Sequence, residues 1–273
     1  MAKQRLDVLL VDLGLCDTRQ QAQRCIRAGE VRVSQHIVDK PGTAVDLAAE
    51  IELKQKSPFV SRGGEKLSKA LVEFAIAAGD RICLDGGIST GGFTDCLLQA
   101  GAKQVYGVDV GYGQVAWKLR TDLRVVLRER TNIRHLQPED LYLSEAVYPD
   151  LGVMDVSFIS LIKVLPAFWQ LLQPPREAVL LVKPQFEVGR EKVGKKGVVR
   201  DPNDQAAAIW QVVQAARALG WCDRGLTWSP LVGPAGNIEY LLWLAEAGLG
   251  AQLSFDQTLA IAQQARQCLQ GNA

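Results

Sequence analysis

The apolar residues at the start of the chain recur with helical spacing. Within residues 5–29, leucines fall at i, i+3, i+4 and i+7, which predicts an amphipathic helix followed by a second short one. Gly14 is placed to end the first helix and Gly29 to end the second, because helices commonly close on a left-handed glycine. Asp17 or Thr18 is expected to cap the second helix.

A change of pattern follows and indicates a domain boundary. Residues 30–53 contain short alternating stretches interrupted by Lys40-Pro41-Gly42, which predicts small strands around a turn. The polar, glycine-containing segment 54–66 is typical of a junction. We therefore expect a small α+β domain over residues 1–58 and a larger domain over residues 59–273.

Beyond the junction, apolar strand-like runs alternate with helical patterns. This alternation predicts an α/β sheet that is mostly parallel and covered by helices on both faces. The expected strands cover residues 81–87, 104–110, 124–131, 150–158, 178–186 and 237–244. The expected helices cover residues 66–76, 93–101, 161–172, 204–220 and 257–270.

Composition narrows the class of protein without identifying it. Hydrophobic residues make up 48% of the 273 residues, which is enough for a buried core. No apolar run approaches the roughly 20 residues that span a bilayer, and the N-terminus lacks a signal-peptide pattern, so a cytoplasmic protein is expected. The net charge of +1 neither requires nor excludes a nucleic-acid partner.

The six cysteines suggest neither a disulfide framework nor a metal site. No two of them form a CxxC pair, and the chain has only two histidines. We expect reduced thiols in the core and no bound metal.

A glycine-rich turn, LDGGISTGGF, follows the first strand of the larger domain and precedes a helix, as in nucleotide-binding loops. It lacks the lysine of a P-loop, and its glycines do not form G-x-G-x-x-G. Asp85 ends the first strand and Asp109 the second. A pyrophosphate would be repelled by Asp85, whereas a ligand with an ammonium group and a ribose diol suits both carboxylates. S-adenosylmethionine has those groups; NAD(H) or a turn without a ligand stays an alternative.

Four polar residues are expected near the edge of the sheet where α/β proteins bind ligands: Lys66, Asp155, Lys183 and Glu239. Each alone is compatible with a surface lysine, a cap or a solvated strand end. Lys183 is more informative, because a charge directly after Ala-Val-Leu-Leu-Val is costly unless it is paired. Together the four suit proton abstraction from a hydroxyl. A neutral amine is favoured by burial and a second amine, and opposed by the carboxylates.

Other methyl-transfer chemistries leave different sequence patterns. Methylation of base amino groups typically uses an [Asp/Asn]-Pro-Pro-[Tyr/Phe] stretch, where this chain has Asp155-Val156-Ser157-Phe158. Methylation of a base carbon needs a cysteine nucleophile at a strand end. Cys83 is expected inside a strand and Cys96 inside a helix, so neither is well placed.

Several motifs in order resemble the TlyA family of rRNA 2′-O-methyltransferases, which are related to FtsJ-type enzymes. They are SRGGEKL, LDGGISTGGFTDCLL, VYGVDVGYGQVAWKLR, ERTN, DVSFISL, LVKPQFEVGR, GVVRDP and GPAGNIEYLLWL. The resemblance implies an N-terminal S4 RNA-binding domain and a Rossmann-like, S-adenosyl-L-methionine-dependent domain. It also implies methylation of cytidine ribose, with ribosomal RNA or ribosomal subunits as partners and with no membrane or metal.

The resemblance also implies roles for individual residues. Lys66, Asp155, Lys183 and Glu239 would be catalytic. Cofactor contacts would come from Asp85, Gly87, Ser89, Gly91, Gly92, Phe93, Asp109, Val110, Thr131 and Asn132. RNA contacts would come from Arg5, Arg19, Lys40 and Arg62, by neutralising phosphate. A basic loop, residues 190–200, is either a mobile flap over RNA or a solvated loop.

The sequence departs from the usual family pattern in two places, and two alternative functions stay open. Gly86 and Ile88 stand where the family usually has a larger residue and alanine, and residues 33–36, Val-Ser-Gln-His, replace a Val-Asn-Gly-like turn. The family is also labelled haemolysin, so a membrane-active protein is one alternative. An RNA-binding protein with an inactive methyltransferase domain is the other.

Overall fold

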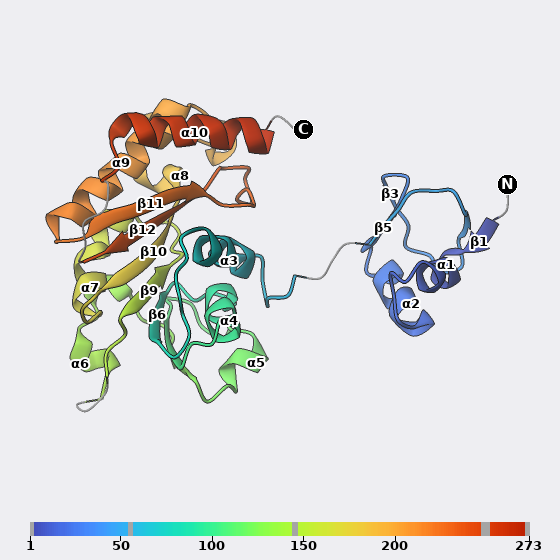
Figure 1. Ribbon diagram of the computed structural model, residues 1–273, viewed down its shortest axis with the longest axis horizontal. Helices are drawn as coiled ribbons and strands as arrows, with labels where there is room; N and C mark the ends of the chain where they lie inside the picture. The colour runs from blue at the N-terminus through green and yellow to red at the C-terminus, as the bar shows by residue number, and fades with distance from the viewer. Residues whose placement is uncertain (1–2, 54–56, 144–146, 247–251, 271–273) are drawn as a thin grey trace. The chain divides into compact units, whose positions relative to one another are not determined.

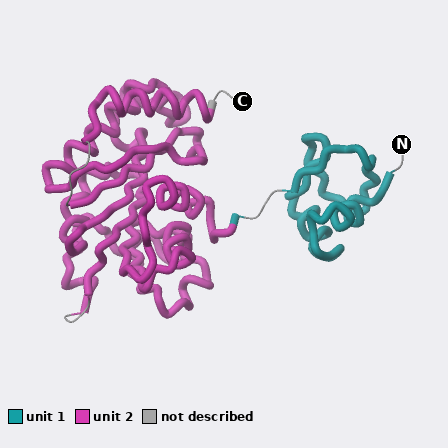
Figure 2. Tube along the Cα trace, in the orientation of Figure 1, with its two compact units in different colours: residues 1–57 teal, residues 58–273 magenta. Residues whose placement is uncertain are grey.

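A computed structural model of the protein describes residues 3–53, 57–143, 147–246 and 252–270. The predicted segment 54–66 therefore begins outside the described residues. The chain divides into two compact units, residues 1–57 and residues 58–273 (Figure 2).

The first unit is a small α+β fold around a leucine-lined core. Its elements are β1 (Lys3–Arg5), α1 (Leu6–Asp12), α2 (Arg19–Arg27), β2 (Val31–Val33), β3 (His36–Ile37), β4 (Ala44–Asp46) and β5 (Ile51–Leu53). β1 pairs with β4, and β2 lies between β3 and β5. The predicted helix ends are confirmed, since Gly14 and Gly29 both have φ of +69°. Thr18 provides the cap, because its hydroxyl accepts a hydrogen bond from the Gln21 N–H.

The second unit is built on a seven-stranded sheet. Its strands are β6 (Ile82–Gly86), β7 (Gln104–Val108), β8 (Val125–Arg128), β9 (Leu151–Met154), β10 (Glu177–Val182), β11 (Cys222–Trp228) and β12 (Tyr240–Ala245). They lie in the order β11-β12-β10-β9-β6-β7-β8. Neighbours from β10 to β8 are parallel, whereas β12 is antiparallel to both β10 and β11. The predicted α/β sheet, mostly parallel, is confirmed.

Helices and short 3-10 turns connect these strands. They are α3 (Gly63–Glu73), α4 (Gly92–Gln99), α5 (Trp117–Arg120), η1 (Ile133–His135), α6 (Pro138–Leu141), η2 (Leu161–Lys163), α7 (Leu165–Gln170), α8 (Pro184–Glu187), η3 (Arg190–Lys192), η4 (Lys195–Gly197), α9 (Pro202–Ala218) and α10 (Phe255–Gln270). The single helix predicted over residues 161–172 is wrong, because η2 and α7 are separate there. The strands predicted over 150–158 and 178–186 are too long. The observed strands end at Met154 and Val182, so Asp155 and Lys183 directly follow them.

Helices cover both faces of the sheet (Figure 1). Successive side chains of a strand point to opposite faces, and β10 shows the division. Val179 and Leu181 belong to one apolar core, which includes residues of α3 and α4. Ala178, Leu180 and Val182 belong to the other core, which includes residues of α7, α9 and α10. A strand buried on both faces has no polar alternation, which explains its continuous apolar run.

Candidate active site

The glycine-rich turn after β6 is in direct backbone contact with two other parts of the site. Gly87 has φ of +86°, and a Cβ there would lie 2.5 Å from the carbonyl oxygen of Asp155. Gly92 begins α4, and a Cβ there would lie 2.9 Å from the backbone nitrogen of Gly64 in α3. The turn therefore packs against the segments that carry Asp155 and Lys66.

Asp85 lies near the end of β6, just before this turn. Its side chain is fully buried, and Oδ2 accepts a hydrogen bond from the Thr94 hydroxyl at 2.6 Å. Oδ1 has no hydrogen-bond partner among the described residues. Burial raises the pKa of Asp85 to about 7. An unsatisfied buried carboxylate oxygen suits a cationic group of a ligand.

A cavity of about 530 Å³ lies beside the end of β7, and we call it the Asp109 cavity. Asp109 lines it together with Val110, Thr131 and Asn132. The Asp109 carboxylate accepts hydrogen bonds from the backbone N–H groups of Ser89 at 2.8 Å and Gly111 at 2.7 Å. The turns after two neighbouring strands therefore fix this carboxylate at the cavity wall.

The structure brings Lys66, Asp155, Lys183 and Glu239 together as two ion pairs. Lys66 Nζ lies 2.5 Å from Glu239 Oε2, and Lys183 Nζ lies 2.5 Å from Asp155 Oδ1. Three of the residues are almost buried; Asp155 is more open. All four line a second cavity of about 590 Å³, which we call the Lys183 cavity.

A third and smaller space, about 180 Å³, adjoins the other two. We call it the Arg62 cavity, because Arg62 and Lys66 give its wall two positive side chains. Gly92 and Phe93, at the start of α4, line it as well. Ser89 and Asp155 line all three cavities, so the three spaces converge at those two residues.

Two predicted cofactor residues lie elsewhere. Asp85 and Gly91 do not line these three cavities. Gly91 precedes α4 with φ of +97° and packs closely against the side chain of Leu119. Its place indicates support of the turn rather than direct contact with a ligand.

The departures at Gly86 and Ile88 are accommodated by their neighbours. A Cβ on Gly86 would lie 2.9 Å from Ile133 Cδ1, so the end of the Ile133 side chain would have to shift for a larger residue. Ile88 is buried and occupies the space over Gly107, where a Cβ would lie 2.4 Å from Ile88 Cδ1. Complementary side-chain sizes therefore keep the turn closed.

Sequence reasoning missed Ser157 and Phe158 as site residues. Both line the Lys183 and Asp109 cavities. Phe158 has φ of +64° and is 92% exposed, with its ring 5.3 Å from that of Phe186. An exposed aromatic residue whose backbone is in the left-handed region is uncommon and indicates a functional position. The stretch Asp155-Val156-Ser157-Phe158 does not reveal these two residues, because neither the left-handed backbone nor the exposure of Phe158 can be read from the sequence.

The loop predicted over residues 190–200 is tied to the site. The Asn237 side chain donates to the Gly197 carbonyl at 2.8 Å and accepts from the Val199 N–H at 2.9 Å. Lys196, with φ of +65°, lines the Lys183 cavity, whereas Lys192 pairs with Asp204 at 2.9 Å. Hence one of the five basic residues of the loop lines the Lys183 cavity.

The cysteines are poor nucleophiles where the site could use them. Burial raises the pKa of the Cys83 and Cys96 thiols to about 12, so both stay protonated near neutral pH. The expectation that all six thiols lie in the core is wrong for Cys268, which is exposed.

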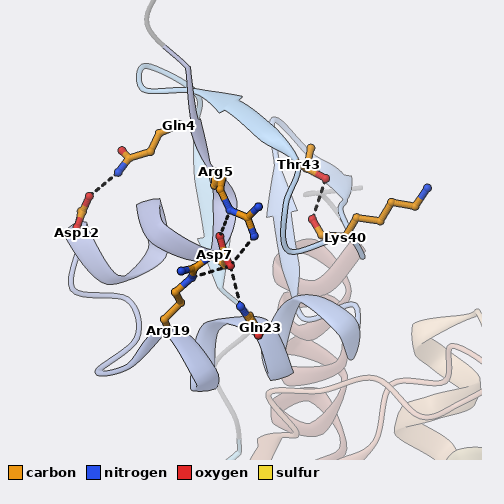
Figure 3. Close-up of polar contacts among 8 residues, drawn as sticks. All are labelled: Gln4, Arg5, Asp7, Asp12, Arg19, Gln23, Lys40 and Thr43. Atoms are coloured by element: carbon orange, nitrogen blue, oxygen red, sulfur yellow. Dashed lines mark hydrogen bonds and ion pairs between the residues drawn. The ribbon is translucent and has the colours of Figure 1, made fainter.

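In the first unit, a buried carboxylate gathers two of the predicted RNA-binding arginines (Figure 3). Asp7 is fully buried and accepts hydrogen bonds from Arg5 at 3.0 Å, Arg19 at 2.9 Å and Gln23 at 2.8 Å. The two arginine side chains remain 52% and 55% exposed. Lys40 is also exposed, and its carbonyl accepts from Thr43.

Two further features bear on the predicted RNA contacts: the position of Arg62 and the conformation of a hairpin in the first unit. Arg62 belongs to the second unit and donates a hydrogen bond to the Val232 carbonyl at 2.8 Å. In the β2–β3 hairpin of the first unit, Ser34 and Gln35 have φ of +47° and +72°. Two consecutive left-handed residues favour Asn-Gly, so the hairpin keeps the usual conformation with less favourable residues.

The fold and the site define a Rossmann-like methyltransferase joined to an S4 domain. The family model of the FtsJ-like methyltransferase matches residues 59–246, and the S4 domain model matches residues 4–51. The chain belongs to the TlyA family, in which these two domains are combined.

Relatives and a solved structure agree with this assignment. The 16S/23S rRNA (cytidine-2'-O)-methyltransferase TlyA of Mycobacterium tuberculosis is 50% identical over 88% of this chain and 89% of its own. Hemolysin A of Brachyspira hyodysenteriae is 42% identical over 87% of this chain and 98% of its own. A solved structure from Streptococcus thermophilus, described as a candidate hemolysin, is 42% identical with a TM-score of 0.77, covering 100% of this chain and 98% of that one. In the described part of this chain, no helix is long and apolar enough to cross a membrane.

Proposed function

We propose that the protein methylates the 2′-hydroxyl of a cytidine in ribosomal RNA and uses S-adenosyl-L-methionine as the methyl donor. The observation that carries this proposal is the convergence of three cavities at Ser89 and Asp155. A reaction between two bound substrates needs such a meeting point, because orientation supplies much of the rate. Lys183 lines the Lys183 cavity together with Ser89 and Asp155, and its amine provides a base.

The residues around the glycine-rich turn fit the parts of S-adenosyl-L-methionine. Asp109 would accept hydrogen bonds from the ribose hydroxyls, with Thr131 and Asn132 beside the adenine. The unpaired Oδ1 of Asp85 would receive the ammonium group through water, because Asp85 is fully buried and does not line the three cavities. Positive Arg62 would favour the carboxylate. When bound, this cofactor supplies a methyl group on a positively charged sulfur atom.

The Lys183 cavity would hold the target nucleotide. In its neutral form the Lys183 amine takes the proton of the 2′-hydroxyl, which makes the oxygen a nucleophile. Asp155 keeps that amine at the cavity wall, and the Lys66–Glu239 pair holds a second amine on the same cavity. The exposed Phe158 ring provides a surface for base stacking, which is worth about 1–3 kcal/mol per base.

The S4 unit would dock the RNA by neutralising phosphates with Arg5, Arg19 and Lys40. Asp7 holds the two arginines in fixed directions while leaving about half of each side chain exposed. Preorganised cations lose less side-chain freedom on binding, so this carboxylate supports RNA affinity even though it is negative.

A methylation assay on ribosomal RNA with Lys183→Ala tests the proposal. Loss of a general base is expected to lower the rate by about 10²–10⁴-fold without loss of cofactor binding in calorimetry. Lys163→Ala is the matched control, because Lys163 is an exposed lysine that does not line the cavities. Lys183→Ala with the control's activity would remove Lys183 as the base.

The position of the methyl group is tested by alkaline hydrolysis. Backbone cleavage needs a free 2′-hydroxyl, so the product RNA should resist cleavage at the modified nucleotide. A 2′-deoxy nucleotide at that position should accept no methyl group. A methylated nucleotide that still cleaves normally would place the methyl group on a base and contradict the proposal.

A further inference from the structure

Ser157 gives the Lys183 amine a second polar partner beside Asp155. Lys183 Nζ donates a hydrogen bond to Ser157 Oγ at 2.8 Å and lies 2.5 Å from Asp155 Oδ1. The side chain of Lys183 is only 10% exposed. Ser157 itself lines both the Lys183 and the Asp109 cavities.

The geometry of an amine makes this second contact important. A neutral amine has two N–H bonds and one lone pair, arranged tetrahedrally around the nitrogen. If only Asp155 held it, the group could rotate about its carbon–nitrogen bond and move the lone pair off the substrate. With one N–H donated to Ser157 and the Asp155 carboxylate 2.5 Å from the nitrogen, fewer directions remain for the lone pair. Lys183 lines the Lys183 cavity, where the target nucleotide would bind.

We propose that Ser157 is a positioning residue that aims the Lys183 lone pair at the 2′-hydroxyl of the target nucleotide. The inference rests on the function proposed above. It adds a hydroxyl group to the four residues that the sequence predicted. Ser157 need not touch the substrate, because it acts through Lys183.

A merely structural serine and a positioning serine differ in their effect on the pH profile. An acceptor for an ammonium group favours the charged form, so removing Ser157 Oγ makes the Lys183 amine easier to deprotonate. The other charged groups that line the cavity, Lys66, Lys196, Asp155 and Glu239, are the same in both proteins. The rate should therefore become lower at its plateau, and the plateau should begin at a lower pH.

The test compares Ser157→Ala with Ser157→Thr and Ser160→Ala in the full-length protein. Thr keeps the acceptor, and Ser160 lies in the same loop but hydrogen-bonds to Glu187 instead. Single-turnover methylation should slow by roughly tenfold or more in Ser157→Ala, since small misplacements of a reacting group have effects of this order. The other two variants should stay close to the wild type. Equal rates and equal pH profiles in Ser157→Ala and the wild type would overturn the inference, as would three equally slow variants.

A readout that needs no RNA separates this inference from the proposed function. Acylation of Lys183 by acetic anhydride, followed by mass spectrometry over a range of pH, reports the fraction of free amine. In Ser157→Ala, acylation should begin at a lower pH than in the wild type or Ser160→Ala. If the wild type methylates no RNA, the proposed function fails, but this shift still supports the hold of Ser157 on the amine. An unchanged acylation profile overturns it.

Discussion

Replacing Gly87 by alanine should damage stability and cofactor binding together. Gly87 has φ of +86°, which costs roughly 1–2 kcal/mol for a residue with a side chain. The added Cβ would lie 2.5 Å from the Asp155 carbonyl oxygen and 3.0 Å from the Asp155 carbonyl carbon. Because these are backbone atoms, no side chain can rotate away, and overpacking of this kind adds about 1–3 kcal/mol. The two contributions together give a loss of about 2–5 kcal/mol.

Gly113→Ala is the matched control for backbone strain. Gly113 has φ of +73°, but a Cβ there would meet no atom within 4 Å, so only the roughly 1–2 kcal/mol of strain is expected. All six tryptophans lie in residues 58–273, so urea unfolding followed by tryptophan fluorescence reports on the correct unit for both variants. Movement of Asp155 away from Ser89 should also weaken S-adenosyl-L-methionine binding at least tenfold, which requires only about 1.4 kcal/mol.

The result that would refute this reasoning is simple. If Gly87→Ala unfolds with the same free energy as Gly113→Ala and binds the cofactor with unchanged affinity, the contact between the turn and Asp155 has no energetic importance. Contacts other than this one would then have to keep the three cavities together.

Three further predictions concern single side chains. Hydrogen bonds from arginine hold the pKa of Asp7 well below its usual range, so this pairing stabilises the fold above about pH 4 and is lost in acid. Asp7→Asn should therefore speed hydrogen exchange in residues 3–53 at pH 7, and this acceleration should shrink progressively as the pH falls below about 4. The pKa of Asp85 is raised to about 7 by burial, so ionisation costs folding free energy as pH rises from about 4 to 7. Over that range the wild type should lose stability relative to Asp85→Asn, and a constant difference would contradict the assignment. Phe158→Leu should weaken RNA binding by about 1–3 kcal/mol in a filter-binding assay. Leu123→Ala should have no effect, because Leu123 is also exposed but does not line the cavities.

A strand whose two faces are both apolar could be predicted from the sequence. A strand that buries a charge paired with a residue of another element could not. β10 was evident because both of its faces are apolar, whereas β11 was not predicted. The stretch Cys-Asp-Arg-Gly-Leu-Thr-Trp places a charge at Asp223 in a fully buried position. Arg217 of α9 neutralises it at 2.7 Å, and the register shifts between Asp223 and Gly225. Neither the partner, six residues upstream on a helix, nor the irregularity has a local signature.

The candidate site shows the same limit. Residues that follow strands, such as Asp155 and Lys183, could be assigned to one edge of the sheet because strand order and chain direction place them there. Which amine pairs with which carboxylate depends on side-chain directions and could not be read from spacing. Phe158 stands out only through its left-handed backbone and its exposure, and both are properties of the folded chain.

The close approach of α3 and α4 affects how the site responds to heat. Their first turns approach closely at glycines, since a Cβ on Gly92 would lie 2.9 Å from the backbone nitrogen of Gly64 and 3.0 Å from Gly63 Cα. The two helices therefore form one stiff block that carries Lys66 and the glycine-rich turn together. The exposed Phe158 ring is held by far fewer contacts. On warming, its loop should loosen first, while the block keeps its internal distances. Loss of RNA capture should then precede loss of cofactor binding.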